Sequence, residues 1–180
     1  MLESISERKP YGVEEFLSPR NLEHADAAVV EIFNLMFGFD IEAVEVPGID
    51  PTAPGQDDRT AIVGFSGAMR GSCQVRMGTP PAQAIASAML GGTPVAEDDD
   101  SIDDALGELC NMLAGGWKNS IPGLSSECAL SPPTVISGRD YKVHTCKPSE
   151  ILLRAYRFDI HTFLLTLCRE ETGRPQGNVV

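Results

Sequence analysis

The sequence lacks a long hydrophobic run and is poor in positive charge. No stretch of its 180 residues approaches 18 uninterrupted apolar residues, the length that a membrane-spanning helix needs. The first residues, MLESISERKPYG, contain no apolar signal-peptide segment, so we expect a cytoplasmic location. Lys and Arg number 14 against 26 Asp and Glu, a formal charge of −12. This negative field disfavours binding to nucleic acid or to an anionic membrane.

The spacing patterns of metal sites and disulfide frameworks are also missing. An EF-hand loop counted from Asp98 would need glycine at Asp103 and glutamate at Leu109, so the acidic run at residues 97–100 is not a calcium loop. The cysteines are odd in number and scattered without a C-x-x-C pair, and the histidines are isolated. We therefore expect the cysteines to be reduced, buried thiols, and we expect neither the cysteines nor the histidines to bind a metal. The cysteines are Cys73, Cys110, Cys128, Cys146 and Cys168, and the histidines are His24, His144 and His161.

Common catalytic motifs are absent as well. There is no phosphate-binding G-x-x-x-x-G-K-[ST] loop, and the run GFSG at residues 64–67 would need glycine at Ala68 to form a nucleophile elbow. The length and an ordinary hydrophobic content of 42% instead predict a single domain that buries a core without disulfides.

Hydrophobic periodicity predicts an α+β domain at residues 21–169, between a flexible arm at 1–20 and a disordered tail at 170–180. One long helix is predicted from Asn21, as N-cap, to Gly38. A second is predicted from Ser101 to about residue 119, with Ser101 and Asp104 forming a capping box. The remaining predicted elements are a helix from Thr79, as N-cap, through residue 90, a loop at 47–59, and strands at 41–46, 60–67, 71–78, 134–136, 141–145, 150–157 and 162–168.

The two long helices resemble each other. Residues 26–38 align without a gap on residues 103–115, an offset of 77, and five of the thirteen positions are identical. We interpret this as duplication of a half-domain, with halves at about 21–95 and 96–169. A duplicated unit predicts a pseudo-twofold fold in which two long helices lie side by side on an extended, largely antiparallel β-sheet.

The second long helix carries an acidic and amide ridge opposite its core face. At about 100° per residue, Asp104, Glu108 and Asn111 fall within about 60° of one another, and Gly115 continues the line. Asparagine is unfavourable inside a helix, and glycine costs stability there and indicates close approach by another group. The core face is predicted to comprise Ile102, Leu106, Leu109, Leu113 and Trp117.

Chemistry at this ridge is limited by its residue types. A Glu/Asn pair cannot by itself cleave an unactivated bond, but it can orient a water for attack on a reactive phosphoryl group, where positioning matters most. The carboxamide of Asn111 accepts from and donates to water without titrating. A carboxylate would be repelled by the phosphoryl group, so Glu108 is better suited to pairing with a cation on a partner.

The pattern Asp104-x-x-x-Glu108-x-x-Asn111, in a helix that follows a strand pair and a short Gly-terminated helix, resembles the CheC/CheX/FliY phosphatases of bacterial chemotaxis. The length, the EIFNLMFG ending of the first helix and the GFSGAMRGSCQVRM strand pair are most like CheX. The similarity covers roughly residues 21–168. The family motif also has a downstream proline, and Pro132 and Pro133 occupy that region.

The resemblance implies hydrolysis of the aspartyl-phosphate of a CheY-like response regulator. Asn111 would enter the regulator's active site and align the attacking water, and Glu108 would pair with a regulator lysine. The family further implies a homodimer paired through the sheets and a Mg²⁺ ion held by the regulator, with no cofactor bound by this chain. Glu31 and Asn34 repeat the pair on the first helix as a possible second site, although Ala27 replaces the aspartate.

Two other interpretations stay open at this stage. One is a non-catalytic module that docks on a response regulator or flagellar switch. The other is a structural α+β protein whose acidic ridge is merely solvated.

Overall fold

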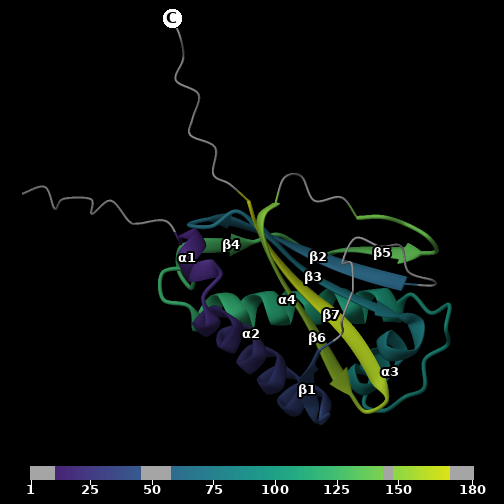
Figure 1. Ribbon diagram of the computed structural model, residues 1–180. Helices are drawn as coiled ribbons and strands as arrows, with labels where there is room; N and C mark the ends of the chain where they lie inside the picture. Colours follow the sequence, from purple (N-terminus) through teal and green to yellow (C-terminus); the bar gives the residue numbers. More distant parts are fainter. Residues whose placement is uncertain (1–10, 46–57, 144–147, 171–180) are drawn as a thin grey trace, which may run out of the picture.

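Two long hairpins form the centre of the computed structural model, which describes residues 11–45, 58–143 and 148–170 (Figure 1). One hairpin joins β2 to β3, the other joins β6 to β7, and β3 lies beside β7. Within these residues the sheet has seven strands, all paired antiparallel, in the order β1-β6-β7-β3-β2-β4, and β5 pairs with β2 next to β4. The strands are β1 (Ile41–Val44), β2 (Asp58–Gly67), β3 (Gly71–Gly78), β4 (Cys128–Leu130), β5 (Thr134–Gly138), β6 (Pro148–Phe158) and β7 (His161–Glu170).

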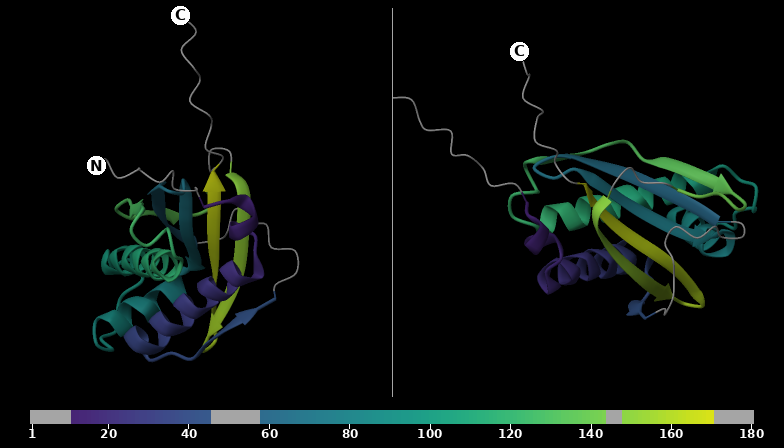
Figure 2. Two further views of the ribbon diagram at one scale, coloured as in Figure 1. Left: turned by 90° about the vertical axis from the view of Figure 1, so that its left-hand side faces the viewer. Right: turned by 45° about the horizontal axis from the view of Figure 1, so that its top comes forward.

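Alternation of apolar residues determines which side of the sheet is buried. In β3 the side chains of Cys73, Val75 and Met77 are at most 3% exposed, and residues two apart point to the same side of a strand. The helices cover this side of the sheet, as the views in Figures 1 and 2 show. The core therefore lies between one sheet face and one helical layer.

The helical layer contains α2 and α4, the two helices expected from the repeat, packed against each other. The helix bounds are α1 (Val13–Phe16), α2 (Pro19–Ile32), the π-helical turn η1 (Phe33–Phe37), α3 (Thr79–Met89) and α4 (Ser101–Ser120). Gly38 ends the first helical segment in the left-handed conformation, with φ of 69°, as glycine commonly does at this position.

The predicted flexible arm is wrong for residues 11–20. These residues form α1 and the start of α2, and Phe16 is completely buried. Asn21 is not the N-cap of α2. That position belongs to Ser18, whose hydroxyl accepts the N–H of Asn21, and Pro19 follows at the first helical position, where its missing N–H costs nothing.

The predicted helix caps at Ser101 and Thr79 are also wrong. Both residues lie inside their helices, and the N-cap positions fall on Asp100 and Gly78, neither of which makes a side-chain capping bond. Asp99 accepts the backbone N–H of Ser101 at 2.8 Å. An aspartate one residue upstream of the N-cap thus satisfies one of the unpaired donors of the first turn.

Most of the predicted strands are present. The strand predicted at 141–145 is absent from residues 141–143, which are not in a strand. Conversely, β4 is a strand that the sequence did not indicate. Several predictions lie outside the described residues, which leave out 1–10, 46–57, 144–147 and 171–180. They concern most of the predicted loop, His144, Cys146 and most of the predicted tail. Glu170, the first residue of that tail, is instead the last residue of β7. The four described cysteines are free and buried, as expected.

Candidate functional site

The two faces of α4 differ as the periodicity predicts. All five residues expected on the core face are at most 2% exposed. On the other side, Asp104 and Glu108 are exposed, and Asn111 and Gly115 are half-buried. The ridge therefore runs along the solvent side of one continuous α-helix, so its side chains share a fixed geometry.

The polar side chains of the ridge have no partner within the described parts of the chain. Asp104, Glu108 and Asn111 make no hydrogen bond or ion pair there. Residues three and four apart on a helix have Cβ atoms about 5–6 Å apart, so the carboxylates and the carboxamide form one compact polar surface. Groups held close together without internal partners are available to another molecule.

The linker between β4 and β5 packs against α4 beside this surface. A Cβ atom added to Gly107 would lie 3.3 Å from Val135 Cγ2 and 3.5 Å from Pro133 Cβ, and Gly107 itself is buried. The linker is fixed by Ser131, whose hydroxyl accepts the N–H of Gly64 at 2.9 Å. The exposed Pro133 therefore lies against α4 at Gly107, the residue before Glu108. Sequence reasoning missed Gly107, although a glycine in mid-helix was the available signal.

The close approach expected at Gly115 occurs at the next residue instead. A Cβ on Gly116 would lie 3.3 Å from both Ala28 Cβ and Ile32 Cδ1, whereas one on Gly115 would meet only Leu130 Cδ1 at 3.9 Å. Gly116 thus permits the tight crossing of α2 and α4. At Gly115 a Cβ would make only an ordinary van der Waals contact, so no close approach within the described residues explains this glycine.

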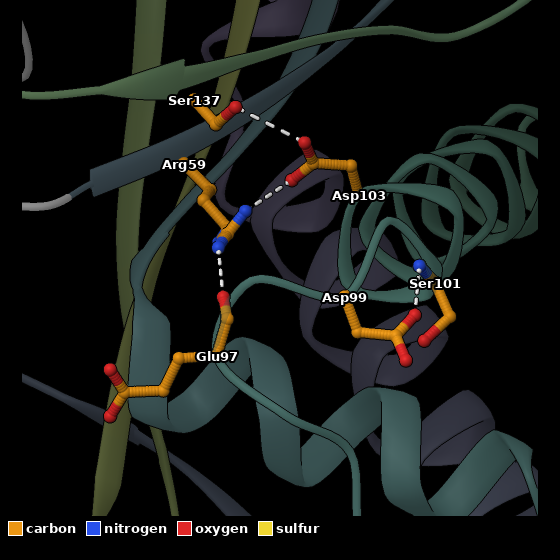
Figure 3. Close-up of polar contacts among 6 residues, drawn as sticks. All are labelled: Arg59, Glu97, Asp99, Ser101, Asp103 and Ser137. Carbon is orange, nitrogen blue, oxygen red and sulfur yellow. Dashed lines mark hydrogen bonds and ion pairs between the residues drawn. The ribbon is translucent and has the colours of Figure 1, made fainter.

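An ionic cluster anchors the first turn of α4 to the sheet (Figure 3). Arg59, at the start of β2, donates to Asp103 Oδ1 at 2.6 Å and to the Glu97 carbonyl at 3.0 Å, and Ser137 of β5 donates to Asp103 Oδ2 at 3.1 Å. Hydrogen bonding by Ser101 lowers the pKa of Asp99 in the same loop. Asp103 immediately precedes Asp104, so this cluster holds the turn from which the ridge begins.

The first half of the chain contains a matching cluster. Asp26, which aligns with Asp103 in the repeat, accepts from Arg154 at 2.7 and 3.2 Å and from the Tyr156 hydroxyl at 2.7 Å. In both halves, therefore, an aspartate of the long helix pairs with an arginine on a sheet strand. This correspondence supports the interpretation of the repeat as a duplication.

The possible second site on the first helix has a different geometry. Glu31 and Asn34 are both exposed, but Asn34 lies in the π-helical turn η1, beyond the end of the regular α-helix. A π turn contains an extra residue relative to an α turn, so the spacing does not place the two side chains as in α4. Val30, the counterpart of Gly107, is 39% exposed, whereas Gly107 is buried.

No group of three or more His, Cys, Asp or Glu side chains suited to a metal ion occurs in the described residues. None of the helices in those parts of the chain is long and apolar enough to cross a membrane.

Comparison with known proteins identifies the family. Residues 59–154 match the family described as chemotaxis phosphatase CheX. The chain belongs to the CheX family. Over 82 residues it is 35% identical to the CheY-P phosphatase CheX of Thermotoga maritima, a match that covers 46% of this chain and 53% of that protein. The chain thus spans about half the length of this curated relative.

Solved CheX structures have the same fold. A CheX from Desulfovibrio desulfuricans superposes with a TM-score of 0.69 at 23% identity, covering 84% of this chain and 99% of that one. The CheX of a CheX–CheY–BeF3–Mg²⁺ complex from Borrelia burgdorferi gives 0.62 at 18% identity, with coverage of 84% and 98%. These similarities confirm the predicted CheC-like α+β fold.

Proposed function

We propose that the protein is a phosphatase that hydrolyses the aspartyl-phosphate of a CheY-like response regulator in chemotaxis or related two-component signalling. The family assignment and the name of the Thermotoga relative support this activity. The observation that carries the proposal is the pair of Glu108 and Asn111, on the solvent side of one rigid helix and without partners in the described chain.

Asn111 is the proposed catalytic residue. An aspartyl-phosphate is already reactive, so its hydrolysis depends mainly on placing a water in line with the bond that breaks. A carboxamide can accept a hydrogen bond from that water and donate one to a phosphoryl oxygen. Because Asn111 lies in the middle of α4, the helix brings this group to the partner in a fixed direction.

Glu108 and Asp104 are proposed docking residues. Their carboxylates are exposed one turn apart on the surface that would meet the regulator, where an opposite charge stabilises the complex and speeds association. A lysine of the regulator is the proposed partner of Glu108. The Borrelia structure, in which a CheX is bound to CheY with BeF3 and Mg²⁺, supports a complex of this kind. We assign the Mg²⁺ to the regulator and no cofactor to this chain.

The test of catalysis follows phosphate release from a phosphorylated CheY-like regulator in the presence of Mg²⁺. The wild-type protein should accelerate the release, and Asn111→Ala should lower kcat by about 100-fold or more, because it removes the group that positions the water. Asn119→Ala is the matched control, since Asn119 is an exposed asparagine in the last turn of the same helix. It should retain wild-type kcat.

Glu108→Ala separates docking from chemistry. It should raise KM with a smaller effect on kcat, because it removes a contact made on association. If kcat falls and KM does not change, the assigned role of Glu108 is wrong. If the wild-type protein binds the phosphorylated regulator without accelerating phosphate loss, the protein is a docking module and not a phosphatase.

We also propose that the protein is a cytoplasmic homodimer paired through its sheets, as the family resemblance implies. Light scattering of the purified chain tests the assembly. A mass near 19.3 kDa, that of one chain, would contradict it.

A further inference from the structure

We infer that Arg59 is a positioning residue, which sets the first turn of α4 and thereby the direction in which Glu108 and Asn111 face a partner. This inference rests on the proposed function. It concerns a residue of β2 that lies outside the ridge and acts on it through Asp103 and the Glu97 carbonyl.

The contacts of Arg59 join β2 to two neighbouring segments that are distant from it in sequence. Its guanidinium connects β2 to the first turn of α4 through Asp103 and to the preceding loop through the Glu97 carbonyl (Figure 3). The Arg59 side chain is 13% exposed and that of Asp103 is 34% exposed, so the pair is partly shielded from water. The planar fork of arginine holds two acceptors at once in a fixed geometry, which lysine cannot reproduce.

Besides the Arg59 contacts, the first turn of α4 is held by Ser137, which donates to Asp103 Oδ2, and by Asp99, which accepts the Ser101 N–H. The N-cap residue Asp100 makes no side-chain capping bond. The other end of the helix is held separately, by the contact of Gly116 with α2 and by the hydrogen bond from Trp117 to Asn21. After loss of the Arg59 contacts, the hydrogen bond from Ser137 still joins Asp103 to the sheet, so the start of the helix is held less firmly than before while its end stays fixed.

This arrangement predicts unequal effects along the ridge. With a rise of 1.5 Å per residue, Glu108 lies about 12 Å and Asn111 about 7.5 Å from Gly116. A tilt of α4 about its anchored end moves Glu108 about 1.6 times as far as Asn111. Docking should therefore suffer more than the chemical step.

Arg154→Met provides a matched control. The Arg154–Asp26 ion pair, at 2.7 Å, is the counterpart of the Arg59–Asp103 pair, at 2.6 Å, but it anchors α2, which does not carry the proposed site. Both methionine variants should lower the melting temperature. Only Arg59→Met should raise KM for the phosphorylated regulator, by about tenfold, with kcat within about twofold of wild type.

The kinetic pattern distinguishes positioning from loss of folded protein, because partial unfolding lowers apparent kcat and leaves KM unchanged. Arg59→Lys should recover part of the wild-type KM, since its ammonium can reach Asp103 but not reproduce the fork. The inference is overturned if folded Arg59→Met has wild-type KM, or if Arg154→Met raises KM equally.

Amide hydrogen exchange tests the same anchor without activity. Arg59→Met should accelerate exchange in the first two turns of α4 and not in α2, and Arg154→Met should do the reverse. If the wild-type protein does not accelerate phosphate release, the proposed function fails. The exchange pattern then still shows whether Arg59 fixes the first turns of α4. Unchanged exchange at the start of α4 in Arg59→Met would refute it.

Discussion

Replacing Asn21 with leucine should destabilise the fold by about 3 kcal/mol, because this buried amide joins the start of α2 to the end of α4. Asn21 is 1% exposed. Its Oδ1 accepts the Trp117 indole N–H at 2.8 Å, and its Nδ2 donates to the Phe16 carbonyl at 2.7 Å. Leucine has a similar size and can make neither bond.

The magnitude follows from the two polar groups that the substitution leaves unpaired. Each buried donor or acceptor without a partner costs about 1–3 kcal/mol. The unpaired Trp117 N–H and Phe16 carbonyl together therefore lower the free energy of unfolding by about 2–6 kcal/mol. Burial of the additional apolar surface of leucine offsets about 1–2 kcal/mol of this loss. For a chain of this length, a net loss of about 3 kcal/mol lowers the melting temperature by about 6–12 °C.

Urea unfolding of a double-mutant cycle with Trp117→Phe measures the bond itself. Phenylalanine has no indole N–H, so the second substitution should cost less in the Asn21→Leu background than in the wild type, with a coupling energy of about 1–2 kcal/mol. Strict additivity of the two substitutions would refute the reasoning. So would an Asn21→Leu variant whose free energy of unfolding lies within about 0.5 kcal/mol of wild type.

Elements with a clear hydrophobic period could be predicted from the sequence alone. The β2–β3 hairpin and the core face of α4 depend on local alternation and on the helical repeat, which side-chain geometry fixes directly. The polar side of α4 followed from the same geometry. The candidate ridge can therefore be predicted from the sequence alone.

Polar residues with distant partners were misassigned. Asn21 was interpreted as a helix cap because asparagine favours that position, but its partner Trp117 lies 96 residues away. Ser101 and Asp104 matched a capping box, whereas the first turn of α4 is held through Asp103 by Arg59, which is 44 residues distant in sequence. Local propensity carries no information about such tertiary bonds, so it cannot exclude them.

The internal repeat predicts which residues of the two long helices correspond but not how the two helices differ. Alignment places Glu31 and Asn34 on Glu108 and Asn111, yet the first pair crosses into a π-helical turn. Next to Asn34 the side chains of Leu35 and Met36 are 75% and 59% exposed. The first helix therefore has the same two residue types without the backbone geometry that makes the α4 pair a candidate site.

Three further outcomes test the backbone, the buried tyrosine and the first helix. Gly71→Ala should cost about 3 kcal/mol or more in urea unfolding, because φ is +154° and a Cβ would overlap the Cys168 carbonyl oxygen. The corresponding change at Gly91, whose φ is +69° with open space around it, should cost only about 1 kcal/mol. Burial raises the pKa of Tyr156 well above 10.0, so above about pH 10 the unfolded chain loses this proton first and stability falls as pH rises. Tyr156→Phe should reduce that alkaline loss, and an unchanged slope between about pH 9 and pH 11 would contradict it. Finally, Asn34→Ala should leave the rate of phosphate release unchanged, because the π turn displaces this amide from the α-helical spacing that the proposed site requires. A clear loss of rate in Asn34→Ala would contradict this and show that the π turn does not disable the first pair.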